Sequence, residues 1–490
     1  MSQIDLDPNS DVPLYKQLAE SVRTLVDRGA IERGERLPAT RELAGLLGLN
    51  RTTVSAAYAM LEQSGLLEGH VGRGSFIAKS DRPLALTSLA ARSIDWEHLL
   101  PPLESLSVPA RKISISFASS CPAGEAFPLA EFRRLSKEVI DSPEAAQILQ
   151  LGSPHGYPPL RRYLLENALA AGMVLPGDDL IVTNGCQQAL DLIARLFFNG
   201  NGRGVVIEDP VYRGVVRVFA RAGATVLSVP LDESGIDLNA LQELIHQHRP
   251  RLLVVTPSFQ NPTGATLPLE RRKRLVDLAQ RHGLVLVEND ICSELRYEGK
   301  SLPTLKQLDE SGSTILLRSY SKISFPGLRV GWAIAPRPVI ARMAEAKQTS
   351  DLHSDQLSQA VLLRFAESGE LARHLDLTRR VGAERLSSIL RCCARYLPAG
   401  SRFTRPEGGM SLWVDLPAPF TAETLLSRVE QRGVDFLPGN FFSVQRSHPR
   451  ALRLSFGGLS PDQISRGMQI LGEAAASEPA AALEPVAASV

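Results

Sequence analysis

Apolar positions near the start of the chain recur at the spacing of an amphipathic helix. Over residues 12–29 these positions are Leu14, Leu18, Val22, Leu25 and Val26. Gly29 follows the last of them and marks the end of the predicted helix. A short second helix is expected over Glu42–Leu47, with Thr40 as its N-cap and Gly48 after its last turn. These signals predict two helices separated by a turn.

A third helix and two short strands complete this N-terminal module. Asn50 is placed to cap a helix over Arg51–Gln63. The apolar positions on the inner face of that helix are Val54, Ala57, Tyr58 and Leu61. Leu66–Glu68 and Gly74–Ile77 are expected to be strands joined by a glycine-containing loop. The order predicts a winged helix-turn-helix, an α+β module with a β-wing.

From residue 112 to residue 473, short apolar runs alternate with helical patterns, which is typical of an α/β domain. The strand candidates are Leu180–Thr183, Gly204–Glu208, Leu252–Thr256, Leu284–Glu288 and Thr314–Arg318. Nearly continuous apolar runs suit strands that are buried on both faces of a mostly parallel sheet. Ligands bind at the carboxyl ends of such strands, so the residues that follow each run are candidates for a site.

The composition fits a multidomain protein. A chain of 490 residues is too long for one core, and 44% hydrophobic with 22% charged residues is ordinary for a soluble protein. The boundaries expected are a winged helix over 11–79, a Ser-, Pro- and Ala-rich linker over 80–111, an α/β domain over 112–473 and a disordered tail over 474–490.

No membrane span is expected, because no run of about 18 apolar residues occurs. The N-terminus has no apolar segment that would make it a secretory signal. The five cysteines are scattered, which fits reduced thiols in a cytoplasm and gives no metal-ligand spacing. We therefore predict neither a membrane partner nor a metal site.

The net charge is only +1, so any contact with DNA must come from a local patch. The polar residues around the turn and the start of the third helix are Arg41, Arg51, Thr52, Thr53 and Ser55. A recognition helix presents such N-terminal residues to the major groove. Arg73, in the loop of the wing, is placed to contact phosphate or the minor groove. The alternative is a helical adaptor that touches only protein.

The stretch Ser319–Trp332 places Lys322 among hydroxyls and glycines, seven residues before Arg329. A lysine amine in this setting can form a Schiff base with an aldehyde cofactor. The hydroxyls of Ser319 and Ser321 and the guanidinium of Arg329 can hold a phosphate.

Four other segments offer partners for such a ligand, although each is commonplace when taken alone. The Gly185-Cys186-Gln187 turn opens a helix, where backbone N–H groups bind phosphate, but most such turns are only turns. Tyr212 can stack on an aromatic ring or simply pack. Asn261, in an Asn-Pro-Thr-Gly turn, can hydrogen-bond a phenolic oxygen. Arg453 can bind a carboxylate or form a surface ion pair.

The segments Leu37–Ala44 and Asn50–Val54 resemble the winged helix of GntR-type bacterial regulators. The motifs of the α/β region follow the order of fold-type I pyridoxal-phosphate enzymes, and residues 112–470 resemble class I aminotransferases. The whole chain thus resembles the MocR/GabR-like branch of the GntR regulators.

This resemblance implies that Lys322 carries pyridoxal 5′-phosphate. The implied phosphate ligands are Ser319, Arg329 and the turn Gly185–Gln187. Asn261 is implied to contact the ring oxygen, and Arg453 the carboxylate of an amino acid. The resemblance also implies a homodimer that binds a double-stranded DNA operator in a bacterial cytoplasm, at the nucleoid.

The chain departs from the aminotransferase pattern at three positions. Asn289 stands where the family carries an aspartate that pairs with the pyridine nitrogen, and Asp290 is its neighbour. Cys292 replaces a tyrosine that bonds the ring oxygen, and Leu151 replaces a tyrosine that reaches the partner's phosphate. These departures predict a site that binds an amine but is poor at moving protons.

We therefore expect a transcriptional regulator that holds pyridoxal phosphate on Lys322 and senses a small amine, an amino acid or a B6-type effector. One alternative is a working aminotransferase that carries a DNA-binding module. The other is a regulator whose pocket has lost the cofactor and serves only for dimerisation.

Overall fold

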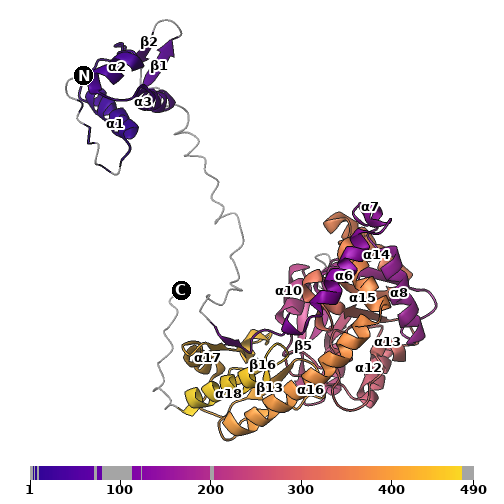
Figure 1. Ribbon diagram of the computed structural model, residues 1–490. Coiled ribbons are helices and arrows are strands. Elements are labelled where there is room, and N and C mark those ends of the chain that lie inside the picture. Colours follow the sequence, from indigo (N-terminus) through magenta and orange to yellow (C-terminus); the bar gives the residue numbers. More distant parts are fainter. Residues whose placement is uncertain are drawn as a thin grey trace. The chain divides into compact units, whose positions relative to one another are not determined.

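The structure is a computed structural model, and it describes residues 4, 6–7, 10, 12–70, 74–79, 113–122, 124–198 and 203–476. The chain divides into two compact units, Met1–Val108 and Pro109–Val490 (Figure 1). The expected linker and the wing residue Arg73 lie outside the described residues.

The first unit is the predicted winged helix. Its elements are α1 (Leu14–Asp27), α2 (Thr40–Leu47), α3 (Arg51–Gln63), β1 (Leu67–His70) and β2 (Gly74–Ile77), with β1 and β2 antiparallel. Asn50 caps α3 as expected, since its side chain accepts a hydrogen bond from the Thr52 N–H at 3.2 Å. The predicted cap at Thr40 is wrong. The Tyr58 hydroxyl donates to the Pro38 carbonyl at 2.8 Å and holds the chain extended there, so Ala39 is the N-cap and Thr40 is the first helical residue.

The second unit is built on an eight-stranded sheet with the order β4-β11-β10-β9-β8-β5-β6-β7. In that order the strands are Asp178–Thr183, Gly331–Pro336, Thr314–Ser319, Val285–Asn289, Leu252–Val255, Gly204–Asp209, Thr225–Asp232 and Gly235–Ile236. The strands β10, β9, β8, β5 and β6 run parallel, whereas β11 is antiparallel to both of its neighbours. All five predicted strands are confirmed, and so is the α/β fold class. The strands β6, β7 and β11 were not predicted.

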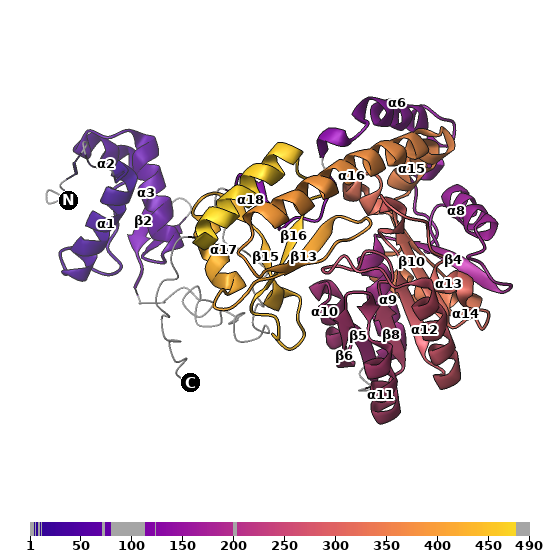
Figure 2. The same ribbon diagram turned by 90° about the horizontal axis from the view of Figure 1, so that it is seen from below.

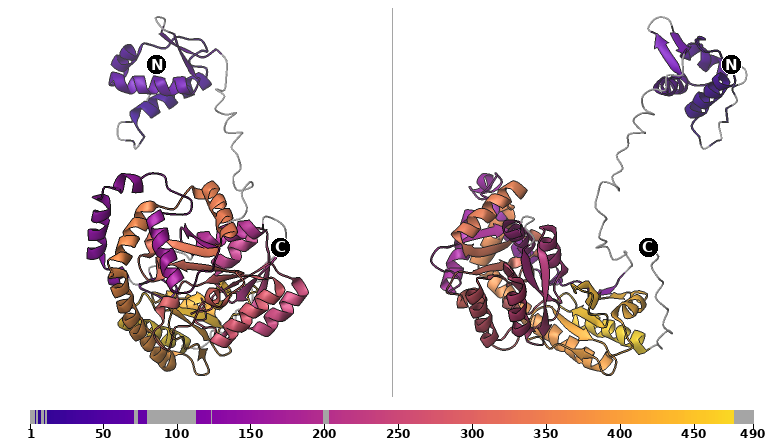
Figure 3. Two further views of the ribbon diagram at one scale, coloured as in Figure 1. Left: turned by 90° about the vertical axis from the view of Figure 1, so that its right-hand side faces the viewer. Right: turned by 180° about the vertical axis from the view of Figure 1, so that it is seen from behind.

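Helices cover both faces of this sheet (Figure 3). On one face lie α9 (Cys186–Phe198), α10 (Arg213–Arg221) and α14 (Arg337–Asp351). On the other lie α8 (Pro158–Ala170), α11 (Leu238–His248), α12 (Leu269–His282) and α15 (Gln356–Glu367). Successive strand residues enter opposite cores: Val205 and Ile207 pack into one, and Val206 into the other. This double burial explains the continuous apolar runs.

A smaller lobe completes the unit (Figure 2). Its antiparallel sheet has the order β12 (Arg402–Phe403), β13 (Ser411–Asp415), β16 (Ala451–Ser455) and β15 (Leu437–Pro438). The helices of this lobe are α16 (Glu370–Tyr396), α17 (Ala422–Glu430) and α18 (Pro461–Ala476). The strand β3 (Ile115–Ser116) joins the lobe by pairing with β14 (Val434–Asp435).

The C-terminal boundary differs from the expected one. The tail was expected from residue 474, but α18 continues to Ala476 because Ala474 and Ala475 are buried in the core of the small lobe. The rest of the expected tail lies outside the described residues. Among the helices that the structure describes, none is both long and apolar enough to cross a bilayer.

Candidate cofactor site and nucleic-acid interface

Lys322 is presented by a tight turn at the carboxyl end of β10. The strand ends at Ser319, and a single 3-10 turn (Tyr320–Lys322) follows. The Ser319 hydroxyl accepts a hydrogen bond from the Ser321 N–H at 3.0 Å and lies 3.0 Å from the Val330 carbonyl. Lys322 is half-buried, and its amine donates to the carbonyl of Ser120. The turn thus fixes the amine at the edge where ligands bind in α/β sheets.

Arg329 and the turn before α9 form a cradle for an anion. The Arg329 guanidinium lies 3.4 Å from the Ser321 hydroxyl and 3.3 Å from the Asn184 carbonyl. Gly185 has a φ of +76°, and a Cβ at that position would overlap the guanidinium. Because α9 begins at Cys186, its free N–H groups point to the same place. A phosphate fits this combination of cation and helix start.

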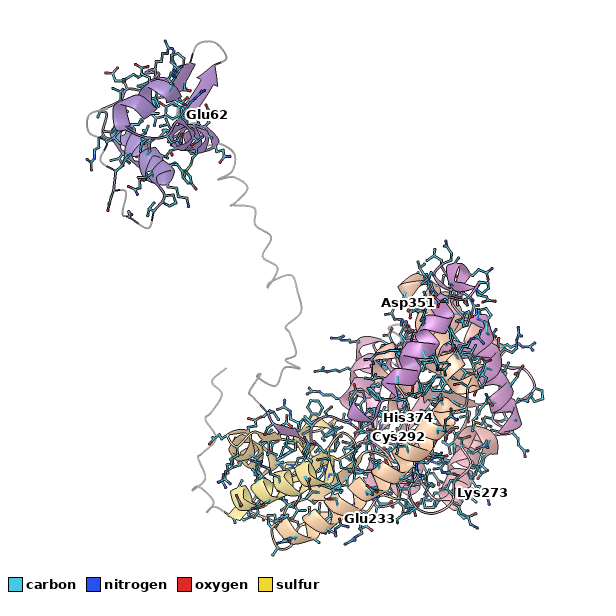
Figure 4. All side chains as sticks on the ribbon, viewed as in Figure 1. Glu62, Glu233, Lys273, Cys292, Asp351 and His374 are labelled. Carbon is cyan, nitrogen blue, oxygen red and sulfur yellow. The ribbon has the colours of Figure 1, made fainter. Side chains whose placement is uncertain are left out.

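An ion pair that the sequence did not reveal supports this turn. Asp351, labelled in Figure 4, accepts hydrogen bonds from the side chains of Asn184 at 2.8 Å and Gln188 at 2.6 Å. The buried amine of Lys347 pairs with the same carboxylate at 2.7 Å. The pair therefore fixes both ends of the turn around Gly185.

Arg453 is a buried cation beside Asn261. The side chain on β16 donates to Asn261 Oδ1 at 3.0 Å and to the carbonyl of Ala118, and it lies 4.9 Å from the Phe442 ring centre. Its Nε is buried and has no hydrogen-bond partner among the described residues. Within the same part of the chain, no carboxylate forms an ion pair with the Arg453 guanidinium. Burial lowers the pKa of Arg453 to about 10, so it stays charged at neutral pH. A buried cation with a spare donor favours an anionic ligand.

Gln187 and Tyr212 lie together on the open side of the site. The Gln187 side chain donates to the Gly214 carbonyl at 3.3 Å, and the Tyr212 ring lies where a Cβ at Gly214 would be. Tyr212 is 46% exposed, which leaves its ring available for stacking.

Asn289 and Asp290, at the end of β9, are the two candidates to face the pyridine nitrogen, and their surroundings differ. Asn289 is half-buried, and its Oδ1 has no hydrogen-bond partner among the described residues. The Asp290 carboxylate accepts a hydrogen bond from Ser293 Oγ at 2.8 Å and forms an ion pair with Arg318 Nε at 3.2 Å. Asp290, one of the predicted cofactor ligands, is thus engaged in an ion pair with Arg318.

Two thiols lie in this region, that of the buried Cys292 and that of the half-buried Cys186. Burial raises the pKa of Cys292 (Figure 4) to about 11, although the nearby charge of Lys322 opposes the shift. Burial likewise raises the pKa of Cys186 to about 12, and its Sγ lies 3.3 Å from the Arg318 carbonyl. Both groups are therefore neutral thiols at physiological pH.

The predicted nucleic-acid residues lie on the outside of the winged helix. Arg41 on α2 is exposed, and at the start of α3 the exposed residues are Arg51, Thr52 and Ser55, with Thr53 half-buried. Arg36 was not predicted. It is exposed, pairs with Phe76 of the wing and lies against Gly74. This surface therefore combines basic groups from the starts of α2 and α3 with Arg36, which lies beside the wing.

Family models match both units of the chain. The model described as aminotransferase class I and II matches residues 115–471, and the model described as bacterial regulatory proteins, gntR family, matches residues 14–77.

Similar proteins include enzymes and regulators. The 2-aminoadipate transaminase of Thermus thermophilus is 37% identical over 76% of this chain and 92% of its own. The probable rhizopine catabolism regulatory protein MocR of Rhizobium meliloti is 30% identical over 96% of this chain and 95% of its own. Among solved structures, the kynurenine aminotransferase of Pyrococcus horikoshii in complex with PMP has a TM-score of 0.73 at 32% identity, and covers 78% of this chain and 97% of its own.

Replacing Gly185 with alanine should weaken binding of a phosphate-bearing ligand. The new Cβ would displace the Arg329 guanidinium, and losing its charge-assisted hydrogen bonds costs about tenfold or more in affinity. An absorbance titration with pyridoxal phosphate measures this. Gly172→Ala is the matched control, because Gly172 has a φ of +70° but no atom within 4 Å of the added Cβ. Equal affinity of the two variants for pyridoxal phosphate would contradict the assignment of Arg329 and the Gly185 turn as its phosphate site.

Arg51→Ala should weaken DNA binding by about 1–3 kcal/mol, which is what one good arginine contact contributes. Fluorescence anisotropy with a labelled duplex measures the loss. Arg28→Ala removes the same charge from the end of α1 and should have a smaller effect. Absorbance of the bound cofactor should be unchanged in both variants, and a matching loss of cofactor would show that the two units are not separable.

Proposed function

The chain is a MocR-like member of the GntR regulators whose C-terminal domain belongs to the class I and II aminotransferases, and we propose that this domain binds pyridoxal 5′-phosphate on Lys322 and senses a small amine or amino acid. One observation carries the proposal: Lys322 follows Ser321, which lies beside the Arg329 guanidinium, and its amine donates to Ser120, two residues from the Ala118 carbonyl that the buried Arg453 holds. That arrangement suits a phosphorylated aldehyde together with an amino acid.

The residues present fit the cofactor. Gly185 leaves room for Arg329 at the phosphate cradle, and the buried Oδ1 of Asn289 still needs a partner. Asn261 turns its Oδ1 to Arg453, which leaves its N–H₂ free to donate to a ring oxygen. Tyr212 can cover the ring face. When bound, the cofactor would supply an aldehyde that condenses with amines and a ring that withdraws electrons.

The polar groups around the lysine favour sensing over turnover. The Asn289 amide carries no charge and cannot hold a protonated ring nitrogen. The nearby carboxylate of Asp290 is committed to Arg318, and the Cys292 thiol is neutral. These side chains can orient a ligand, but they give little help in moving its protons.

A second candidate is an active aminotransferase that carries a DNA-binding module. The specific relatives named as transaminases favour it. A third candidate, a pocket without cofactor that serves only for dimerisation, would leave the buried Arg453 without a counter-ion. The effector class stays open between a B6-type compound, a GABA-like amine and an amino acid.

We also propose that the protein acts as a homodimer on a DNA operator in the bacterial cytoplasm. Apolar side chains that a partner could cover are exposed near the cradle: Leu149 by 64%, Leu151 by 77% and Leu352 by 55%. The Gln356 side chain donates to the Ile148 and Gln150 carbonyls at 3.3 and 2.8 Å, so the segments that carry these leucines lie together. A second copy of the chain would bury them.

Borohydride reduction of protein saturated with pyridoxal phosphate should attach the cofactor at Lys322 alone. The reason is that Lys322 is the residue after Ser321, whose hydroxyl lies 3.4 Å from the Arg329 guanidinium of the anion cradle. Peptide mass spectrometry identifies the modified lysine. Lys322→Ala should lose the visible absorbance, whereas the exposed Lys273→Met should retain it. Modification spread over several lysines, or none at all, would contradict the proposed function.

Asn289→Asp should raise transamination between amino acids and 2-oxo acids, or shift the cofactor absorbance, because a carboxylate can hold the ring nitrogen protonated. Keto-acid formation and absorbance spectra measure these effects. Asp290→Asn is the control, since that change breaks the Arg318 pair without adding charge to the site. If neither keto-acid formation nor the absorbance changed in Asn289→Asp, the side chain at position 289 would not face the ring.

A further inference from the structure

A five-residue segment, Ala118–Pro122, crosses the site and is held there by its two cations. We call this segment the strap. Lys322 donates to the carbonyl of Ser120, and Arg453 donates to the carbonyl of Ala118. The two acceptors are two residues apart on one chain, so about 7 Å at most separates their Cα atoms. The reactive amine and the buried guanidinium therefore converge on the same short backbone.

The chain before the strap is anchored firmly to the small lobe. The Phe117 N–H donates to the Asp435 carbonyl and its own carbonyl accepts from the Ser455 N–H, both at 2.9 Å. Its side chain is fully buried in the core of that lobe. Before it, β3 pairs with β14. The strap therefore starts from a fixed point.

The chain after the strap is anchored to the large lobe. The Phe127 ring packs against Phe325 with centres 5.3 Å apart, and α6 (Leu129–Ile140) begins next. Among the described residues, the Ala118 N–H also donates to Ser116 Oγ at 3.3 Å, but the carbonyls of the strap are held only by Lys322 and Arg453. The position of the strap thus depends on two donors that belong to the binding site.

A ligand would compete for both donors. When Lys322 condenses with an aldehyde, a C=N bond forms, water leaves and the nitrogen keeps at most one hydrogen, so Ser120 loses its partner. A ligand carboxylate would take hydrogen bonds from Arg453 that are stronger than the bond to the neutral Ala118 carbonyl. A carboxylate that binds side-on to the spare Nε–H also takes an N–H of Nη2, the atom that donates to Ala118.

We propose that the strap reports occupancy of the site: cofactor binding frees Ser120, and an amino-acid ligand frees Ala118. This inference rests on the proposed function. In the sequence, the strap follows β3 within the second unit. Release of the strap therefore changes the backbone that lies between the anchor at Phe117 in the small lobe and the anchor at Phe127 in the large lobe.

Cys121 gives a direct readout of the strap. It is exposed, whereas Cys186 is half-buried and Cys292, Cys392 and Cys393 are buried. A nitroxide attached to Cys121 of the full chain reports local mobility by electron paramagnetic resonance, and Cys121→Ser checks the site of labelling. Lys322→Met and Arg453→Met remove one donor each but keep apolar bulk. Lys273→Met and Arg342→Met make the same changes at exposed ion pairs.

The ligand-free protein should give broad lines. Lys322→Met, Arg453→Met and saturation of the wild type with pyridoxal phosphate should each shift the spectrum toward narrow lines, and the two control variants should not. Unchanged lines in both site variants would overturn the proposal. So would unchanged lines when absorbance shows that pyridoxal phosphate is bound. If no pyridoxal phosphate binds at all, the proposed function fails, and the strap proposal falls with it.

Discussion

The turn at the carboxyl end of β10 is the constraint on which the site depends. The Ser319 hydroxyl links the Ser321 N–H to the start of β11 through the Val330 carbonyl. That link sets Lys322 on one side of the turn and brings Arg329 back beside Ser321. Neighbouring parallel strands end at the same edge, so β4, β5, β8 and β9 deliver the other polar groups to this point.

Electrostatics then decide what the site is suited to do. The two groups suited to anions are guanidinium groups, those of Arg329 and of the buried Arg453. Two polar groups at and after the end of β9 are neutral, since Asn289 is an amide and burial raises the pKa of the Cys292 thiol. The carboxylate of Asp290 is neutralised by Arg318. These charges are the basis on which we propose a site that binds an anionic amine and does little proton transfer.

The sequence predicted the parts of the fold that have local signals. Apolar runs located five strands because both faces of each strand are buried, and Asn50 was recognised as a helix cap. The predictions failed where the cause is tertiary. The bond from Tyr58 to Pro38 moved the start of α2 to Thr40, and burial of Ala474 extended α18.

The site was predictable at its side chains but not at its backbone. Lys322, Arg329 and Arg453 stand in recognisable motifs, and the structure brings them into one region. The strap was missed because its acceptors are backbone carbonyls, which every residue carries and which therefore leave no signal in the sequence. They also lie 202 residues from Lys322 and 335 residues from Arg453. Asp351 was missed for a similar reason: it acts on Asn184 from 167 residues away.

A regulator of the proposed kind requires that occupancy of the Lys322 site and DNA binding by the winged helix are coupled. The most direct measurement is the affinity of the full chain for pyridoxal phosphate with and without saturating operator duplex. Footprinting first identifies the operator sequence. Linkage requires that the duplex changes this affinity by the same factor by which the cofactor changes affinity for the duplex. The account predicts equal factors different from one; a cofactor affinity that ignores bound DNA would contradict it.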